Sequence, residues 1–406
     1  MRSQLKAQPL CTKPVSGMFT GSDKYLKLQS VTLREATPPI AEDDSLLVYV
    51  TAGTGYITIN GVVFDLRPGV FCWLQSYHVF TVEPNLGHTL QLQVLAYDYP
   101  LSSYMTYRSN RPAGLTAFST AMPLYALTPA RKHRVEELLA EFAVYNEDYT
   151  PGANLIKCSI IGQLSYVFID LCREYSATHT HVRHHWPLGW ILSLFIAYSC
   201  AEALDPKSVA ESFGVSVPTL NRELRITTGL NFSQSVSRAR INLAASAILF
   251  SELSFHFIST YCGFRSEVAF YRTFRELKGM TPQEYREQAI ATVGVPRKMI
   301  SETVERILFY IHNNFHEQIS LKTMAQDLYI SENIIRTLLA DTLHTNFKDI
   351  LSVYRLHYAE ALLVVTDMPI LDVSLASGFN SERTFTRLFK ERNGITPSAY
   401  RAMFTV

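Results

Sequence analysis

The pattern of hydrophobic residues divides the chain into a strand-like part and a helical part. Between residues 46 and 97, short runs of β-branched and aromatic residues alternate with turn sequences. The runs are LLVYV (46–50), GYITIN (55–60), VVFDL (62–66), VFCWL (70–74) and TLQLQVLAY (89–97). Asn60-Gly61, between two of these runs, predicts a tight hairpin because both central residues of a type I′ turn need positive φ. Short strands at this spacing predict a small antiparallel sandwich or barrel.

The hydrophobic period becomes helical near residue 129. A first helix is predicted at 129–146, after a Thr-Pro pair that suits a cap and a first helical position. A second helix is predicted at 154–176, and its apolar stripe is broad enough to contact two surfaces. These surfaces would be the strand region and a second subunit; the alternative is that the whole stripe is buried in the core of one chain. The most apolar segment, 187–204, is interrupted by Gly189 and is short for a bilayer-spanning helix of about 20 residues. It is therefore expected to be a buried helix.

The C-terminal half is a duplication. Residues 204–286 align with 319–401 at a constant offset of 115 positions without a gap, and 24 of the 83 pairs are identical. A repeat of this length indicates a duplicated domain, since solenoid repeats are much shorter. Each copy begins with a helix, a turn and a serine that caps a second helix, Ser216 or Ser331. This arrangement is a helix-turn-helix signature, and connecting helices are predicted to follow it at 232–250 and 347–365.

The second half of each copy carries one motif, G-F-x-S-x-x-x-F-x-R-x-F-[K/R]-x-x-x-G-x-T-P-x-x-Y-R. Its fixed residues are Gly263, Phe264, Ser266, Phe270, Arg272, Phe274, Arg275, Gly279, Thr281, Pro282, Tyr285 and Arg286, and again Gly378, Phe379, Ser381, Phe385, Arg387, Phe389, Lys390, Gly394, Thr396, Pro397, Tyr400 and Arg401. At these residues the chain resembles the AraC/XylS family of bacterial transcription regulators. The resemblance implies two helix-turn-helix motifs per unit, and two units in tandem depart from the single unit usual in the family.

The strand region carries a looser resemblance. The pattern G-x-G-x-x-x-I-N-G followed by x-L-x-P-G is similar to the cupin-like sensor half of many such regulators.

The predicted geometry suits double-stranded DNA. A connecting helix of about 18 residues spans roughly 27 Å and can hold two recognition helices near one DNA turn apart, about 34 Å. These helices are expected at 217–224, 266–275, 332–339 and 381–390. Candidate base readers are Thr219, Asn221, Arg222, Arg265, Glu267, Arg272, Asn333, Arg336, Asn380, Glu382, Arg383 and Arg387; the alternative for each is a solvated helix face. Six phenylalanines are expected in the core: Phe264, Phe270, Phe274, Phe379, Phe385 and Phe389.

Charge sharpens the comparison of the two units. Residues 187–290 hold ten Lys and Arg against nine Asp and Glu, and 297–406 hold twelve against twelve. Because phosphate contacts supply much of DNA affinity, near-neutral units must gather basic residues on one face. The recognition helix expected at 332–339, ENIIRTLL, has few side chains that can hydrogen-bond to a base. The opening helix of the first unit is unusually apolar, and we hypothesise that it packs against the N-terminal half or a partner subunit.

Other chemistry is weakly indicated. Tyr49, Tyr56, Trp73 and His78 are candidates to line an effector pocket in the strand region, or are plain core. His78, Glu83 and His88 lack the H-x-H pairing of a metal site, and the histidines at 179–185 are expected to belong to a polar linker. The six cysteines show no paired spacing, which suits reduced thiols in a cytosol. No cofactor, no metal and no membrane contact is expected, and no secretion signal is seen.

The predicted protein is a multidomain α+β chain. It comprises an arm (1–30), a cupin-like β sandwich or barrel that senses a signal (31–128), a helical dimerisation or linker region (129–186) and two all-α AraC-type domains (187–290 and 301–406). We expect a bacterial, cytoplasmic, sequence-specific DNA-binding transcription regulator that acts as an activator, although the sequence does not fix the sign of regulation. The expected partners are DNA, RNA polymerase, a small-molecule effector and a second copy of the chain. In the alternatives, one AraC-type unit is only a docking or dimerisation module, or the protein is a cupin enzyme with a DNA-binding tail.

Overall fold

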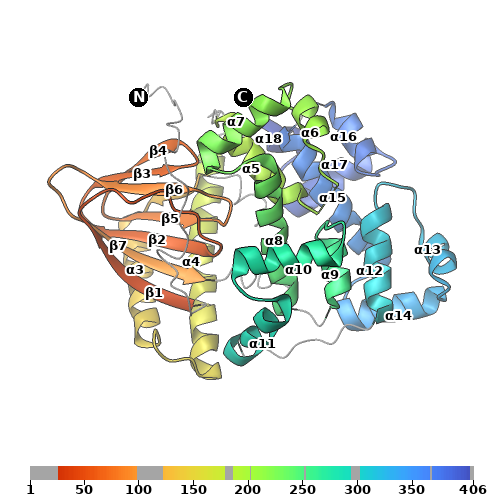
Figure 1. Cartoon of the computed structure of the whole chain (residues 1–406), viewed down its shortest axis with the longest axis horizontal. Helices are drawn as coiled ribbons and strands as arrows, with labels where there is room; N and C mark the ends of the chain where they lie inside the picture. Colours follow the sequence, from red (N-terminus) through yellow and green to blue (C-terminus); the bar gives the residue numbers. More distant parts are fainter. Residues whose placement is uncertain are drawn as a thin grey trace.

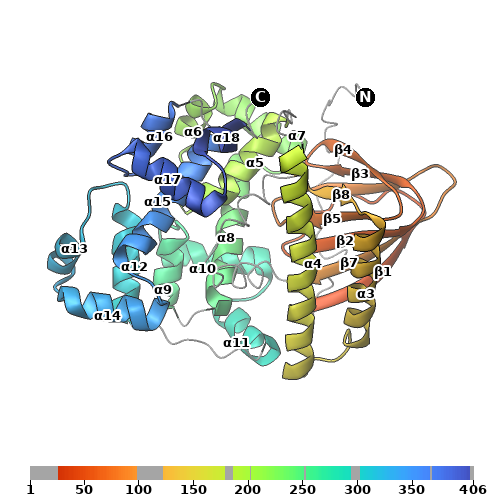
Figure 2. The same cartoon turned by 180° about the vertical axis from the view of Figure 1, so that it is seen from behind.

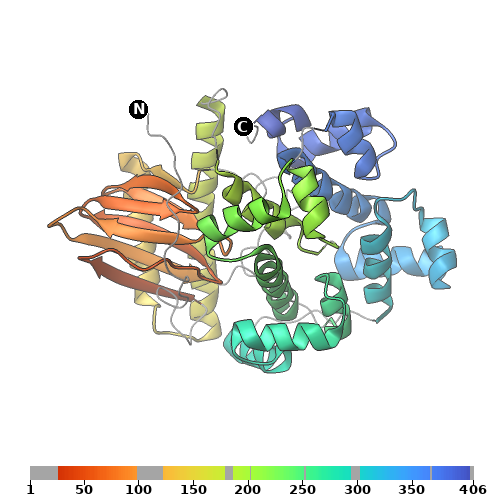
Figure 3. The ribbon, with the colours of Figure 1, turned by 45° about the horizontal axis from the view of Figure 1, so that its top comes forward.

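The structure is a computed structural model that describes residues 26–97, 122–178, 186–201, 203–250, 253–293, 302–365 and 368–402. A β domain with two long helices lies on one side, and an all-helical half lies on the other (Figure 1). This confirms the predicted fold class. In the helical half, the first repeat unit lies between the β domain and the second unit (Figure 3).

The β domain is an antiparallel sandwich of two sheets. The larger sheet has the order β1-β7-β2-β5-β8 and the smaller one β4-β3-β6. The strands are β1 (Leu26–Leu33), β2 (Ser45–Ala52), β3 (Gly55–Ile59), β4 (Val62–Leu66), β5 (Val70–Leu74), β6 (Phe80–Pro84), β7 (Leu90–Tyr97) and β8 (Leu124–Ala126). Asn60 and Gly61, with φ of 45° and 82°, turn β3 into β4 as predicted.

One predicted boundary is wrong. β1 begins at Leu26, inside the segment 1–30 that was expected to be an irregular arm. The alternating residues of β1 pair along their whole length with β7, from Leu26 opposite Tyr97 to Leu33 opposite Leu90. The alternation of apolar and polar residues in LKLQSVTL was the available signal, while the partner strand that pairs with it lies more than 50 residues away in the sequence.

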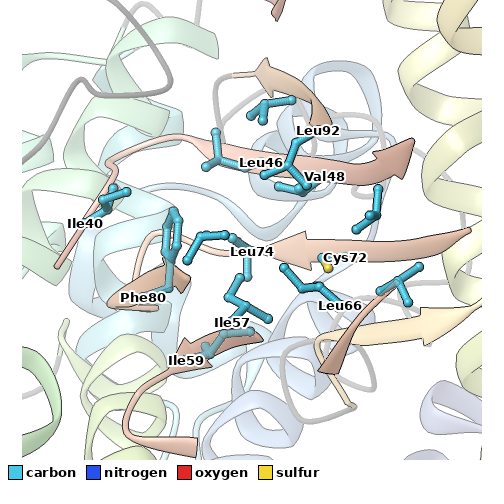
Figure 4. Packing of buried hydrophobic residues seen from close by; sticks show 14 of the residues in the cluster. Ile40, Leu46, Val48, Ile57, Ile59, Leu66, Cys72, Leu74, Phe80 and Leu92 are labelled. Atoms are coloured by element: carbon cyan, nitrogen blue, oxygen red, sulfur yellow. The ribbon is translucent and has the colours of Figure 1, made fainter. Parts of the chain in front are cut away.

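The larger sheet is buried on both faces, which explains its continuous hydrophobic runs. On β2, Leu46 and Val48 point between the sheets, where they meet residues such as Ile57 and Leu74 (Figure 4). The intervening residues Leu47 and Tyr49 point to the other face and belong to a second core. The sheet therefore needs a cover of helices on that second face.

Two helices supply that cover. They are α3 (Pro129–Val144) and α4 (Pro151–Thr178), which lie across the sheet (Figure 2). The predicted start of α3 is confirmed at Pro129, although the Thr128 side chain makes no capping hydrogen bond. Within the described residues, one helix segment, Gly152–Cys172, is long and apolar enough by length and composition to cross a membrane. In this fold its Leu164 and Phe168 are buried in the core beneath the sheet.

The two repeat units have matching helices. In the first they are α5 (Leu188–Ser199), α6 (Pro206–Ser212), α7 (Val217–Thr228), α8 (Phe232–Phe250), α9 (Phe255–Tyr261), α10 (Glu267–Lys278) and α11 (Pro282–Val293). In the second they are α12 (Glu302–Asn314), α13 (Leu321–Leu328), α14 (Glu332–Leu343), α15 (Phe347–Val365), α16 (Ile370–Ala376), α17 (Glu382–Asn393) and α18 (Pro397–Ala402). Helices α8 and α15 are the predicted connecting helices, with the predicted bounds 232–250 and 347–365.

An arginine on each connecting helix fixes the halves of its unit together. Arg240 on α8 donates from Nε to the Cys200 carbonyl at 2.7 Å, and its guanidinium lies 5.9 Å from the Phe264 ring. Arg355 on α15 donates to the Phe315 carbonyl at 2.8 Å and lies 5.8 Å from Phe379. Each pair of equivalents is 115 positions apart, so the duplication extends to individual contacts.

Helix α5 lies where the β domain and both units meet. Trp190 is buried, stacks on Trp186 with ring centroids 4.3 Å apart, and joins the core between the two sheets. A Cβ at Gly189 would overlap the Thr227 side chain of α7 and lie 2.6 Å from the Glu223 carbonyl, so α5 packs very close to α7. Helix α5 also lies against α15 of the second unit. The hypothesis that this apolar helix packs on the N-terminal half is confirmed.

Candidate nucleic-acid interface

Four helices occupy the predicted recognition positions, and each begins at a serine cap. The serine hydroxyls accept the backbone N–H three residues later: Ser216 from Thr219, Ser266 from Ala269, Ser331 from Ile334 and Ser381 from Thr384, at 3.2–3.4 Å. The caps fix where α7, α10, α14 and α17 begin, and hence which side chains stand on their first turns.

Helix α7 exposes less than the sequence suggested. Asn221 is half-buried: its amide donates to the Val217 carbonyl at 3.1 Å and its oxygen accepts from the Phe232 N–H at 3.0 Å, so it joins α7 to α8. The Thr219 hydroxyl lies 2.9 Å from the Ser216 hydroxyl. Arg222 is the exposed candidate, paired with Glu223 at 2.9 Å.

A shallow groove beside α7 includes one residue that sequence reasoning missed, the exposed Arg225. Its place three residues after Arg222, on the same helix face, was the available signal. The residues that line the groove are Pro206, Val217, Pro218, Asn221, Arg225, Asn231, Phe232 and Ser233.

Helix α10 presents Arg272, whose side chain is 74% exposed and lies 3.9 Å from Glu276. Arg265, in the turn before the helix, is also exposed. Glu267 is half-buried and lies 3.5 Å from His256, so a neighbouring side chain already engages it. The two arginines are therefore the available readers of this helix-turn-helix motif.

Helix α14 is the weakest candidate of the four. Asn333 and Arg336 are exposed, and Arg336, the one basic residue of α14, pairs with Glu332 at 3.2 Å. The exposed surface includes two apolar residues, Ile334 and the turn residue Tyr329. This surface offers little to either a base or a phosphate.

Helix α17 carries the most favourable arrangement. Its candidates Glu382, Arg383 and Arg387, and Asn380 just before it, are all exposed. Arg383, Arg387 and Lys390 recur at helical spacing along one side of a shallow hollow, together with Glu382 and Thr386. Arg387 also pairs with Glu391 at 2.7 Å. Thr386 and Lys390 were absent from the candidates, although Lys390 lies three residues after Arg387 and so faces the same side.

The phenylalanines of the repeated motif form the interior. Five of the six predicted core residues are buried, and Phe264 is half-buried with its ring 5.4 Å from Phe270. The motif therefore combines an aromatic core with the polar face of the recognition helix.

The four candidates for an effector pocket do not converge on one site. Tyr49 and Trp73 face the covering helices, and Tyr49 donates a hydrogen bond to Glu136 at 2.6 Å. Tyr56 is exposed, and His78 is buried beside Trp190, with 5.3 Å between the ring centroids. The space between the sheets is filled by aliphatic side chains and Phe80 (Figure 4). The strand alternation that separates Tyr49 from Tyr56 follows from register, which composition does not reveal.

The titration of these side chains follows their burial. Burial raises the pKa of Tyr49, and its hydrogen bond to Glu136 raises it further. Burial lowers the pKa of His78 to about 3, so this imidazole is neutral at physiological pH. Among the residues that the structure describes, no group of three His, Cys, Asp or Glu side chains could hold a metal ion. The histidines at 179–185 lie outside the described residues.

Two family models match the chain. The model described as "Helix-turn-helix domain" matches residues 209–288 and again 324–403, and the model described as "AraC-like ligand binding domain" matches residues 32–145. The chain belongs to the AraC family. Its two helix-turn-helix matches coincide with the two repeat units, so the AraC-type DNA-binding domain is present twice.

Two similar proteins match the chain over part of its length. The chain is 27% identical over 134 residues to an "Uncharacterized HTH-type transcriptional regulator YtdP" of Bacillus subtilis, and 33% identical over 100 residues to one of Staphylococcus aureus (strain MRSA252). These matches span 32% and 25% of this chain, and 17% and 13% of the relatives' lengths.

Similar solved structures include a Listeria innocua protein of unknown function, 31% identical, with a TM-score of 0.25, covering 26% of this chain and all of that one. Another is an apo variant of ToxT from Vibrio cholerae, 13% identical, with a TM-score of 0.31, covering 66% of this chain and 99% of that one.

Proposed function

We propose that this protein is a sequence-specific DNA-binding transcription regulator whose N-terminal domain receives the controlling signal. The observation that carries the proposal is α17, where Arg383, Arg387 and Lys390 line one exposed side of a capped recognition helix. Arginine can bind guanine O6 and N7 with two hydrogen bonds, while lysine pairs with phosphate. Exposed Arg272 on α10 gives the first unit a comparable reader.

The motifs of the two units contribute unequally in this proposal. We assign DNA reading to α10 and α17, with α7 contributing Arg222. Helix α14 carries Arg336 as its one basic residue and exposes Ile334, with Tyr329 exposed in the turn before it, which favours a supporting role. This refines the alternative in which one whole unit serves only for docking.

The remaining partners are part of the same proposal. The AraC-like ligand-binding domain would take a small-molecule effector, and the bound protein would act on RNA polymerase in the cytoplasm, where bacterial DNA lies. The uncovered side of α4 exposes Leu155 (73%) and Tyr166 (60%). Leu155 and Tyr166 are eleven positions apart, so they stand on one helix face, which a second copy of the chain would cover. The protein acts as a regulator in this proposal, without enzymatic activity.

DNase footprinting on the chain's own upstream DNA tests the proposal. Arg272→Ala and Arg387→Ala should each remove protection from a different segment, while the unaltered protein covers successive major grooves about one turn apart. Arg34→Ala, at an exposed arginine of the β domain, is the matched control and should leave the footprint intact. If Arg387→Ala retains the full footprint, α17 is not a reader.

A further inference from the structure

An acidic segment of the β domain, residues 42–44, lies against the first DNA-binding unit. One Asp43 oxygen is 3.4 Å from Arg238 Nε on α8, and the other is 3.2 Å from Lys278 Nζ at the end of α10. Arg238 also donates from Nη2 to the Glu42 carbonyl at 2.8 Å. A single carboxylate thus joins the connecting helix and a recognition helix of the first unit to the sensor domain.

The contact is sheltered from water. The side chains of Arg238 and Lys278 are only 15% and 13% exposed, and that of Asp43 is 31% exposed. Burial alone would raise the pKa of Asp43, but Lys278 and Arg238 outweigh burial and hold this pKa below its ordinary value. Ion pairs this sheltered are screened less by salt than pairs on the open surface.

The second unit has no equivalent of this contact, so the fold does not require it. The positions equivalent to Arg238 and Lys278, 115 residues later, are Val353 and Asn393. Asn393 points inward and donates to the buried Glu360 at 2.9 Å. The two cations are therefore specific to the unit that touches the sensor domain.

These cations matter for the charge that the first unit can offer to DNA. The unit has ten basic residues against nine acidic ones. Arg240 and Arg286 already donate to the carbonyls of Cys200 and Leu253. The other six basic residues stay exposed, namely Lys207, Arg222, Arg225, Arg265, Arg272 and Arg275. Release of the contact with Asp43 would add two cations, Arg238 and Lys278, to these six.

We propose that the acidic segment is an intramolecular latch that competes with DNA phosphates for Arg238 and Lys278, so that the first unit binds DNA at full strength only when the latch opens. This inference rests on the proposed DNA binding and adds its regulation. Anything that pulls residues 42–44 away from α8 and α10 raises DNA affinity.

The test is a salt titration of binding to a 40-base-pair duplex of mixed sequence. Asp43→Asn should bind about tenfold tighter at low salt than the unaltered protein. The plot of log affinity against log salt should steepen by about 1.8, since each added phosphate contact contributes about 0.9. Asp65→Asn makes the same charge change at an exposed residue of the same domain and should match the unaltered protein.

A second variant distinguishes release of the cations from loosening of the domains. Lys278→Gln also weakens the latch, but it removes a cation that would contact phosphate, so its affinity gain should be much smaller than that of Asp43→Asn. Equal gains in DNA affinity for both variants, or no gain in affinity for Asp43→Asn, would overturn the proposal that Asp43 competes with DNA phosphates.

Hydrogen–deuterium exchange of the unaltered protein provides a test that needs no variant. The amides at 42–45 should exchange faster when the duplex is bound; unchanged exchange in the bound protein contradicts the proposal. Absence of binding by the unaltered protein and all variants would overturn the proposed function together with the latch. Binding that is equal in all of them overturns the latch alone.

Discussion

The two DNA-binding units share a skeleton but have different outer surfaces. Inside, the contacts of Arg240 and Arg355 repeat almost atom for atom. Outside, buried Trp190 on α5 is replaced at the equivalent position by Glu305 on α12. Trp190 enters the β-domain core, whereas Glu305 accepts hydrogen bonds from Ser254 at the start of α9. The two units therefore keep the same internal arginine contacts, whereas the residues that meet neighbouring domains differ between them.

The interiors also differ, at an ionic cluster of the second unit. The second unit buries an ionic cluster in which Glu360 binds Arg392 at 3.3 Å, and Arg392 lies 2.7 Å from His357. The first unit has Ala245 and Leu277 where the second has Glu360 and Arg392. Ala245 is buried, but Leu277 is 43% exposed, so the first unit has no buried side chain at the position of Arg392. The variants below test whether the second unit needs its ionic cluster.

The largest expected effect is the loss of Trp190. Trp190→Ala should lower the free energy of unfolding by roughly 3–5 kcal/mol, because it leaves a cavity between the sandwich and α5. Urea unfolding measures this change. Tyr56→Ala, at an exposed strand position, is the control and should cost about 1 kcal/mol or less. A Trp190→Ala protein as stable as the control would show that α5 does not anchor the first unit.

The next largest effect concerns the ionic cluster. Glu360→Ala should cost about 3 kcal/mol, since it leaves the Arg392 side chain, only 7% exposed, without its carboxylate. Adding Arg392→Leu reproduces the residues of the first unit and should recover most of that loss in the same denaturation measurement. If the double variant is no more stable than the single one, the two interiors are not interchangeable.

A smaller effect depends on pH and involves Asp44, the last residue of the acidic segment that forms the latch. Burial raises its pKa to about 6; Asp43 and Glu42 raise it as well, while Lys278 lowers it. The contribution of protonated Asp44 to the free energy of unfolding is therefore fully present when the pH is below 3.8, the ordinary pKa of aspartate, and is lost as the pH rises through about 6. Because asparagine resembles the protonated form, Asp44→Asn should be more stable than the unaltered protein by about 1 kcal/mol at pH 7.5.

Urea unfolding of both proteins at pH 7.5, 6 and 4 checks this prediction, and the difference should vanish at pH 4. Asp65→Asn serves as the control and should stay within about 0.5 kcal/mol of the unaltered protein. A difference that is constant across pH would exclude titration of Asp44 as its cause.

The smallest effect separates the first motifs of the two units. Tyr329 ends α13 in the left-handed region with φ of 57°, where the first unit has Gly214 with φ of 64°. Tyr329→Gly should raise the free energy of unfolding by about 0.5 kcal/mol, because relief of backbone strain slightly exceeds the added flexibility of the unfolded chain. Gly214→Ala is the reciprocal control and should destabilise; thermal unfolding of the pair compares them. Destabilisation by Tyr329→Gly would mean that the exposed ring makes a contact of its own.

Much of the DNA-binding half could be predicted from the sequence. Serine caps, glycine ends and the spacing of phenylalanines are local signals, and the duplication supplied each of them twice. Exposed Arg272 and Arg387 follow from this periodicity. The role of Asn221 could not be predicted in this way, because an asparagine on the first turn of a helix can either face DNA or hydrogen-bond to the next helix. Only the position of α8 decides that its oxygen accepts from Phe232.

The β domain was less predictable. Five strands could be read from composition, but β1 depended on its partner β7. The effector candidates Tyr49 and Tyr56 lie on different sheets, and strand alternation turns both away from the space between the sheets, so they lie on opposite sides of the sandwich.

The sequence by itself determined the duplication, the helix-turn-helix units and the sandwich class, because hydrophobic period and capping act over a few residues. The tertiary structure decided which surfaces meet: that Trp190 enters the β core, and that Asp43 reaches both Arg238 and Lys278. Those pairings join residues that are far apart in the sequence. Their energy depends on burial and distance, and neither quantity exists until the chain has folded.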